Sequence, residues 1–237
     1  MKKSDWKRIG TAMLMVAALL LGGCSTPNEE VTPTEERNMT PVDLDLEKDV
    51  LFFGRTYDKA GIRWMNWSGS GFSVRFQGSG LAAEVYSNLP DSRDTAYLKV
   101  CIDGVEQEDV RLQKDIQMLM LAEGLDPDAE HTVEVRKRTN VKSSTAGISR
   151  LVLTDGKILE PEEPKERLIE FLGDSLTVGY MASKEGKTAG AWSTMTEDVT
   201  GTYIPQIAKA FDAEYQVVAV SGRGVVRNNG GDEDILF

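Results

Sequence analysis

Two short stretches of the chain carry the residue types that acyl transfer needs. Gly173-Asp174-Ser175 follows one apolar run, and Ser221-Gly222 follows another further along the chain. A serine at the carboxyl end of a parallel strand lies where ligands bind in open α/β sheets, and free backbone N–H groups there can stabilise an oxyanion. A serine nucleophile also requires a general base, yet the single histidine, His131, lies far upstream. The sequence therefore predicts part of an acyl-transfer site without its base.

The residues around these stretches follow the pattern of one β-α-β unit. Residues 168–172 and 216–220 are apolar runs of strand length, and each precedes a turn that contains glycine. We expect both to be buried parallel strands, and we expect Ser175 to open a helix. Between the strands, apolar residues recur at helical spacing, with a proline tolerated in the first turn. These residues are Ile204, Ile207, Ala208 and Phe211, and the proline is Pro205.

An earlier and longer region alternates apolar and polar residues with period two. Between Val50 and Leu159, short runs of this kind are separated by turn signals such as Asp103-Gly104. Short strands at this spacing favour an all-β sandwich of jelly-roll type. We therefore expect a multi-domain chain, β first and α/β second. The sandwich would cover residues 48–160, and the partial α/β domain would cover residues 167–237.

Two reactive residue types within the sandwich region are expected to be structural. His131 shares a strand face with Val133 and Val135, which predicts a histidine at the edge of the core and not a base for Ser175. Cys101 lies in an apolar run and is expected to be a small core residue, a reactive thiol being the alternative.

The first residues of the chain have the three parts of a secretion signal. Four basic residues precede the apolar stretch 9–21, which is too short to span a bilayer. Leu21-Gly22-Gly23-Cys24 resembles the lipobox of bacterial lipoproteins, in which the cysteine is acylated; the alternative is a plain signal with an incidental cysteine. We expect residues 1–23 to be a signal peptide, Cys24 to be lipidated and residues 24–47 to be a disordered tether. The protein would then be lipid-anchored outside the cytoplasm, to the bacterial cell membrane or the cell surface.

Composition excludes some classes of partner. The 237 residues include 27 Lys and Arg against 38 Asp and Glu, which gives a formal net charge of −11. Nucleic acid requires a basic surface, so nucleic-acid binding is excluded. A hydrophobic content of 41% is enough for a sizeable core. With Cys24 lipidated, Cys101 has no partner, and no disulfide is expected.

The two stretches with catalytic residue types also resemble known sequence blocks. "FLGDSLTVGY", residues 171–180, is similar to the first block of the SGNH (GDSL-type) hydrolases, in which this serine is the nucleophile. "VVAVSGRGVVRN", residues 217–228, resembles their second block, whose glycine donates an oxyanion-hole N–H. The resemblance implies that Ser175 is the nucleophile and that its own N–H and that of Gly222 hold the oxyanion. Gly224 is the alternative to Gly222.

The upstream half narrows the resemblance to carbohydrate esterase family 2. "GRTY" at 54–57, "WSGSGFSVRFQGSGL" and "HTVEVRKRT" are similar to that family, in which a jelly roll precedes an SGNH domain that removes acetyl groups from plant polysaccharides. The resemblance implies a carbohydrate O-acetyl esterase that acts on an acetylated polysaccharide or oligosaccharide. It implies no metal and no organic cofactor. We expect Trp192, Arg227 and Asn228 to contact the substrate, and we expect a monomer.

The later blocks of the SGNH pattern do not follow within the 237 residues. G-x-N-D would complete the oxyanion hole, and D-x-x-H would supply the base. The sequence therefore predicts an incomplete and nearly inactive piece of a longer esterase, with the catalytic base absent. The alternative is a lipid-anchored, carbohydrate-binding lipoprotein with a vestigial hydrolase domain, which would hold glycans through Trp64, Trp67 or Tyr57.

Overall fold

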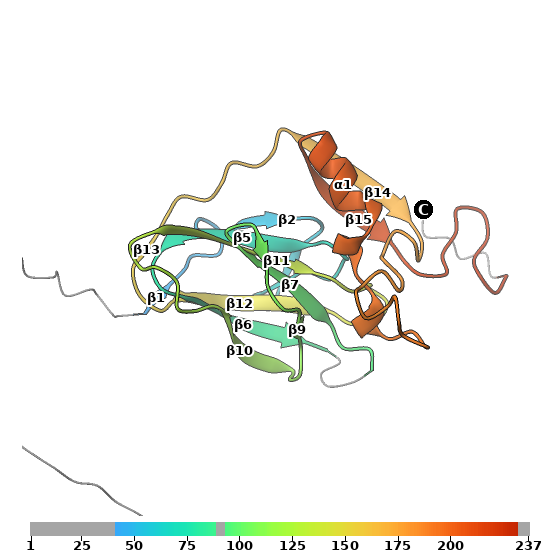
Figure 1. Ribbon diagram of the computed structural model, residues 1–237, viewed down its shortest axis with the longest axis horizontal. Coiled ribbons are helices and arrows are strands. Elements are labelled where there is room, and N and C mark those ends of the chain that lie inside the picture. The colour runs from blue at the N-terminus through green and yellow to red at the C-terminus, as the bar shows by residue number, and fades with distance from the viewer. Residues whose placement is uncertain (1–40, 89–92, 232–237) are drawn as a thin grey trace, which may run out of the picture. The chain divides into compact units, whose positions relative to one another are not determined.

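Two antiparallel sheets form a sandwich in the computed structural model (Figure 1), which describes residues 41–88 and 93–231. The first sheet has the order β10 (Ile116–Ala122), β6 (Leu81–Ser87), β12 (Ala146–Leu153), β4 (Ile62–Trp64) and β3 (Tyr57–Lys59), and β1 (Val42–Asp43) pairs with β12. The second has the order β13 (Lys157–Ile158), β5 (Gly71–Gln77), β11 (Glu130–Lys137), β7 (Tyr97–Ile102) and β8 (Val105–Glu106). In the second sheet β2 (Leu51–Phe53) also pairs with β5, and β9 (Val110–Arg111) pairs with β7.

The core of the sandwich follows from the period-two pattern of its strands. Apolar side chains on one face of each strand point between the two sheets and are buried there. The predicted β-sandwich is confirmed by this arrangement. Its most completely buried apolar side chains include Phe72, Phe76, Leu81, Leu98, Ile148, Leu151 and Leu153.

The sandwich begins earlier in the chain than the sequence pattern suggests. Val42 and Asp43 pair with β12, and Leu44 is buried in the core. These residues lie inside the segment 24–47 that we expected to be a tether. Residues 1–40 lie outside the described residues, and with them the predicted signal peptide, Cys24 and most of the predicted tether.

The hairpin predicted at Asp103-Gly104 is present between β7 and β8. Ile102 pairs with Val105, and the two turn residues have φ values of 51° and 78°. Positive φ at both positions is the geometry of a type I′ turn, which matches the right-handed twist of the flanking strands. Cys101, one residue before the hairpin pair, is half-buried, so it contributes less to the core than predicted.

The predicted β-α-β unit is also present. The strands β14 (Arg167–Gly173) and β15 (Ala213–Ala219) are parallel, and α1 (Tyr203–Ala210) lies between them in sequence. The Thr202 side chain accepts a hydrogen bond from the N–H of Ile204 and caps the helix, with Pro205 in the first turn as expected. Two 3-10 turns, η1 (Thr194–Thr196) and η2 (Val199–Gly201), precede it. No helix within the described residues has the length and apolar character to cross a membrane.

One expectation for this unit is wrong: β14 is not fully buried. Leu168 and Leu172 are 58% and 55% exposed, whereas the alternate residues Ile169 and Phe171 are half-buried. Within the described part of the chain β14 pairs with β15 alone, and apolar side chains cover one face of it. A run of consecutive apolar residues predicts two covered faces, and the second face has no cover here.

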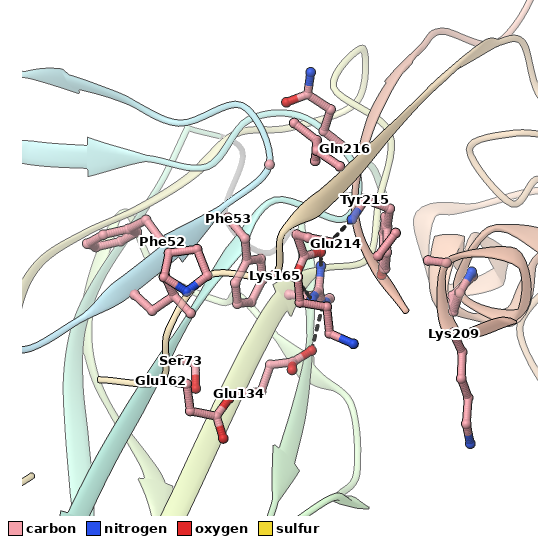
Figure 2. A pocket seen from close by; sticks show the side chains of 18 of the residues that line it. Phe52, Phe53, Ser73, Glu134, Glu162, Lys165, Lys209, Glu214, Tyr215 and Gln216 are labelled. Carbon is pink, nitrogen blue, oxygen red and sulfur yellow. Dashed lines mark hydrogen bonds and ion pairs between the residues drawn. The ribbon is translucent and has the colours of Figure 1, made fainter. Parts of the chain in front are cut away.

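A buried arginine joins the sandwich to the first residues of β15. The Arg136 guanidinium lies 3.8 Å from the centroid of the Phe53 ring and 4.4 Å from that of Tyr215. It donates hydrogen bonds to Glu134 at 2.5 Å and to both carboxylate oxygens of Glu214 at 3.2 and 3.3 Å. Arg136 lines a cavity of about 500 Å³. Figure 2 shows its neighbours Phe53, Glu134, Glu214 and Tyr215 in the wall of that cavity. Every side of this cation is occupied by a ring or an acceptor, which fixes where β15 starts.

Candidate active site

The register of the parallel pair brings the two predicted motifs to one edge of the sheet. Gly173 pairs with Ala219 at the carboxyl ends of β14 and β15, and the N–H of Val220 donates to the Gly173 carbonyl at 3.2 Å. The turns that hold Ser175 and Gly222 therefore start from neighbouring positions. This edge is where ligands bind in open α/β sheets.

Ser175 lies in a series of turns that follows β14. The N–H of Val178 donates to the Asp174 carbonyl at 3.0 Å, and the N–H of Tyr180 donates to the Ser175 carbonyl at 2.8 Å. The helix expected to open at Ser175 is absent, because these bonds span four and then five residues and do not continue as an α-helical ladder. Ser175 is half-buried.

Gly173 is required for this turn by a close approach. A Cβ at this position would lie 2.0 Å from the Thr177 hydroxyl oxygen. That hydroxyl is itself 3.0 Å from the Tyr203 hydroxyl of α1, so it has a fixed neighbour. Any side chain at position 173 would push the serine turn away from the helix.

Gly222 lies in a turn that only glycine adopts easily, with φ at +84°. Its carbonyl accepts a hydrogen bond from the N–H of Asn229 at 2.9 Å, which closes the loop that follows β15. Within the loop the Asn228 side chain accepts from the N–H of Gly224 at 3.0 Å. The structure thus gives the second motif a defined loop conformation, and the role of the Gly222 N–H remains a prediction.

His131 is occupied elsewhere, in agreement with the prediction that it does not serve Ser175. Its Nδ1 lies 2.8 Å from the Asp103 carboxylate and its Nε2 lies 2.8 Å from the Asp126 carbonyl. Burial lowers the pKa of His131, but the Asp103 and Asp126 hydrogen bonds outweigh it and raise the pKa overall. Within the described residues no imidazole or carboxylate accepts a hydrogen bond from the Ser175 hydroxyl.

Replacing Asp103 with Asn is expected to make the stability of the protein less dependent on pH. A raised pKa in the folded state stabilises the fold at pH values below about 6.5, and the contribution is lost as pH rises through the folded value. Asn accepts the same N–H bond from Thr132 and tolerates the positive φ, but it removes the charge. Chemical unfolding should therefore show a loss of about 1 kcal/mol at pH 5.5 and a smaller loss at pH 8.5. An equal loss at both pH values would contradict this account of His131.

A cavity of about 350 Å³ is lined by residues from both parts of the fold, among them Tyr180 from the first motif block and Ser221 from the second. Tyr180 and Trp192 stack nearly parallel in its wall, with ring centroids 6.5 Å apart and planes 2° from parallel. The Trp192 ring N–H donates to Glu197 at 3.2 Å. Aromatic rings beside polar groups suit the apolar faces of sugars. The cavity is lined by Asp94, Asn140, Lys142, Ser143, Tyr180, Trp192, Glu197 and Ser221.

Two buried titratable side chains lie at this cavity: Glu197, which lines it, and Lys137, which bonds the carbonyl of the lining residue Asn140. Burial raises the pKa of Glu197, although hydrogen bonds from Asn140 and Trp192 and the charge of Lys137 oppose the rise. Burial lowers the pKa of Lys137 to about 7, while the Glu197 charge raises it. Lys137 donates to the carbonyls of Thr139 and Asn140 at 2.7 and 3.2 Å. These contacts fix the backbone that leaves β11.

The three predicted substrate contacts occupy different environments. Trp192 lines the cavity, as described above. Asn228 is buried and holds its own loop, whereas Arg227 is exposed on that loop. Substrate contact by these residues stays a prediction. Sequence reasoning missed Asn140 and Glu197, which no motif marks, and Tyr180 stood within the first block without being singled out. No cluster of three or more His, Cys, Asp or Glu side chains that could hold a metal occurs within the described ranges.

Comparisons with known proteins agree with this arrangement. The profile described as "Carbohydrate esterase 2 N-terminal" matches residues 52–162, which cover most of the sandwich. An acetylxylan esterase / glucomannan deacetylase of Cellvibrio japonicus is 32% identical over 173 residues, which is 70% of this chain and 44% of that protein. The chain is a relative of carbohydrate esterase family 2.

Solved structures of the family share the fold. The family 2 esterase from Cellvibrio japonicus superposes with a TM-score of 0.71 at 27% identity, over 82% of this chain and 56% of that one. A family 2 esterase from Clostridium thermocellum, solved in complex with cellohexaose, gives a TM-score of 0.67 at 26% identity, over 77% of this chain and 54% of that one. The chain thus spans about half the length of these family 2 relatives.

Proposed function

We propose that the chain supplies the nucleophile and part of the oxyanion hole of a carbohydrate O-acetyl esterase. The observation that supports this most directly is the register of β14 on β15, which brings the Ser175 and Gly222 turns to the same edge. The relative named as an acetylxylan esterase and glucomannan deacetylase suggests acetylated plant polysaccharides or oligosaccharides as substrates. The aromatic wall of Tyr180 and Trp192 suits a sugar ring next to the reacting acetyl group.

In this reaction the Ser175 hydroxyl attacks the acetyl carbonyl, and the N–H groups of Ser175 and Gly222 hold the oxyanion. The bond from the acetyl carbon to the sugar oxygen then breaks, the sugar leaves with the proton that came from Ser175, and water releases acetate from the acetyl-serine. The base that takes the serine proton must reach it from residues outside the described part of the chain. We further propose that the sandwich is a jelly roll and that β14, α1 and β15 open an SGNH-type hydrolase domain. The greater length of the relatives leaves room for the G-x-N-D and D-x-x-H blocks.

Acetate release tests the proposal. A version of the chain extended through the two later blocks is expected to release acetate from acetylated xylan or glucomannan, and Ser175→Ala in that version should abolish the release. The 237-residue chain should show no appreciable turnover of 4-nitrophenyl acetate. Binding of oligosaccharide by the extended version without any acetate release would contradict the esterase assignment.

A second candidate function is carbohydrate binding by the sandwich of a surface lipoprotein. A groove of about 200 Å³ on the hairpin of β3 and β4 is lined by Tyr57, Lys59, Ala60, Ile62, Trp64 and Thr145. The exposed Tyr57 and half-buried Trp64 offer aromatic faces there. Titration of the 237-residue chain with xylo- and cello-oligosaccharides decides it: this function requires binding that Tyr57→Ala removes and Ser175→Ala leaves intact.

We also propose that Cys24 is acylated and that the mature protein is anchored to the membrane outside the cytoplasm. The support is the order of a basic segment, a short apolar stretch and Leu-Gly-Gly-Cys in the sequence. Mass spectrometry of protein expressed in a bacterial host should find an N-terminus at Cys24 that carries acyl chains, and Cys24→Ala should yield unlipidated protein. An unmodified cysteine at that N-terminus, or cleavage elsewhere, would refute the anchor.

A further inference from the structure

The loop that leaves β11 brings one side chain of the sandwich into contact with the second motif. Asn140 is 2% exposed, and its side-chain amide nitrogen lies 3.0 Å from the hydroxyl oxygen of Ser221. Ser221 directly precedes Gly222. The sandwich therefore contacts the residue next to the proposed oxyanion donor.

The Asn140 side chain is held in one orientation. Its oxygen accepts a hydrogen bond from the N–H of Lys142 at 3.1 Å, so the amide nitrogen is the atom that faces Ser221. Its backbone is fixed as well: the N–H donates to Glu197 at 3.0 Å, and the carbonyl accepts from Lys137. A buried amide with all of these groups engaged cannot rotate without breaking several hydrogen bonds.

The peptide between Ser221 and Gly222 lies at the centre of a turn that the N–H of Arg223 closes on the Val220 carbonyl at 3.1 Å. A Cβ built on Gly222 would meet nothing closer than the Asn229 Cβ at 3.8 Å, so the space beside Gly222 is open and the Ser221 side chain is the tie from this turn to the sandwich. That peptide carries the Gly222 N–H, whose direction depends on the backbone of Ser221. An oxyanion donor is effective only if it is aimed before the charge develops.

We propose that Asn140 is a positioning residue, which holds Ser221 and thereby aims the Gly222 N–H. This rests on the proposed function, and it assigns the sandwich a direct part in the reaction. Asn140 acts through Ser221 and contacts no reacting atom. Glu197 and Lys137, both buried, hold its backbone: Glu197 accepts from the Asn140 N–H and Lys137 donates to the Asn140 carbonyl.

Amide hydrogen exchange of the 237-residue chain tests the positioning without any turnover. Asn140→Ala should speed exchange in the segment 221–224 by about tenfold or more, because the loop opens more easily when one of its ties is lost. Ser221→Ala, which removes only the acceptor hydroxyl, should give a similar increase. The double variant should add little to either one, since both remove the same bond.

Asn66→Ala is the matched control, because Asn66 makes a comparable side-chain bond to the Tyr57 hydroxyl at 2.8 Å. It should leave exchange in 221–224 unchanged. Unchanged exchange in both Asn140→Ala and Ser221→Ala would overturn the proposal, as would full additivity of the two. Ser221→Ala keeps the test decisive if Asn140→Ala fails to fold.

Kinetics of the extended version then separate positioning from substrate binding. Asn140→Ala and Ser221→Ala should each lower kcat by about tenfold with little change in KM, since an interaction that acts only in the transition state affects kcat. A raised KM with unchanged kcat would make Asn140 a ground-state contact and would refute its positioning role. Absence of turnover in the extended parent would count against the proposed function, while the exchange result would still decide the positioning.

Discussion

Arg136→Met is expected to lower the free energy of unfolding by about 3 kcal/mol, the lower end of the range for breaking a buried ion pair. Arg136 is 8% exposed and donates to Glu134, Glu214 and the carbonyl of Gly69. Methionine fills similar space and keeps an apolar stem between the rings of Phe53 and Tyr215, so the change removes mainly charge and hydrogen bonds.

The size of the loss follows from what the substitution leaves behind. The Glu214 side chain is 24% exposed and the Glu134 side chain 41%, so both carboxylates recover some hydration. The Gly69 carbonyl loses a donor at 3.1 Å in a buried position. Unsatisfied buried groups cost about 1–3 kcal/mol each, which places the sum near the lower limit for a buried pair. The loss should appear first as faster amide exchange in residues 213–216, where β15 starts.

Arg150→Met is the control, because Arg150 also faces a carboxylate through two nitrogens but does so at the surface. Its side chain and that of Asp43 are 51% and 60% exposed. Such pairs contribute at most about 1 kcal/mol. Chemical unfolding of both variants gives the comparison. Similar small losses in the two would show that Arg136 is not the link between the sandwich and β15.

The sequence pattern predicts the sandwich well, because alternation of apolar and polar residues in a short strand places all of its apolar side chains on one face, which must then be buried. It fails at the end of β11, where Arg136, Lys137 and Arg138 follow one another and are all buried. Three consecutive cationic residues suggest side chains that are exposed to solvent, since charged side chains are rarely buried unless they are paired. Several of their partners are distant in the sequence: Glu214 accepts from Arg136, and Asp109 and the carbonyl of Met195 accept from Arg138. Pairing across such distances leaves no local periodicity.

The candidate site likewise contains residues that the sequence predicts and residues that it does not predict. Ser175 and Gly222 could be found from the sequence because their turns need glycine and small polar residues in a fixed local order. Asn140 and Glu197 could not, because their roles arise from the packing of the sandwich against the β-α-β unit. The exposure of one face of β14 in the described structure could not be predicted either, because its apolar run indicates that both faces are covered.

Ser175→Ala in the version extended through the two later blocks is expected to reduce kcat for acetyl esters by roughly 10⁶-fold. Loss of this magnitude is typical of a nucleophile that acts as a unit with its base, since neither works without the other. The substitution removes one oxygen from a half-buried position, so thermal unfolding should change little. A loss of only tenfold in kcat would mean that Ser175 is not the nucleophile.

Gly222→Ala tests the oxyanion donor in the same extended version. Alanine at a φ of +84° is strained, and relief of that strain tilts the N–H away from its direction. Loss of one donor raises the barrier by about 2.7–4 kcal/mol, which corresponds to a decrease in kcat of about 10²–10³-fold. Gly61 is the control, because its φ is +75° and a Cβ there meets nothing within 4 Å, on the turn between β3 and β4. Gly61→Ala imposes similar strain far from the motif turns in the sequence, so an equal loss of turnover in both variants would show that strain alone, and not the direction of the Gly222 N–H, lowers the rate.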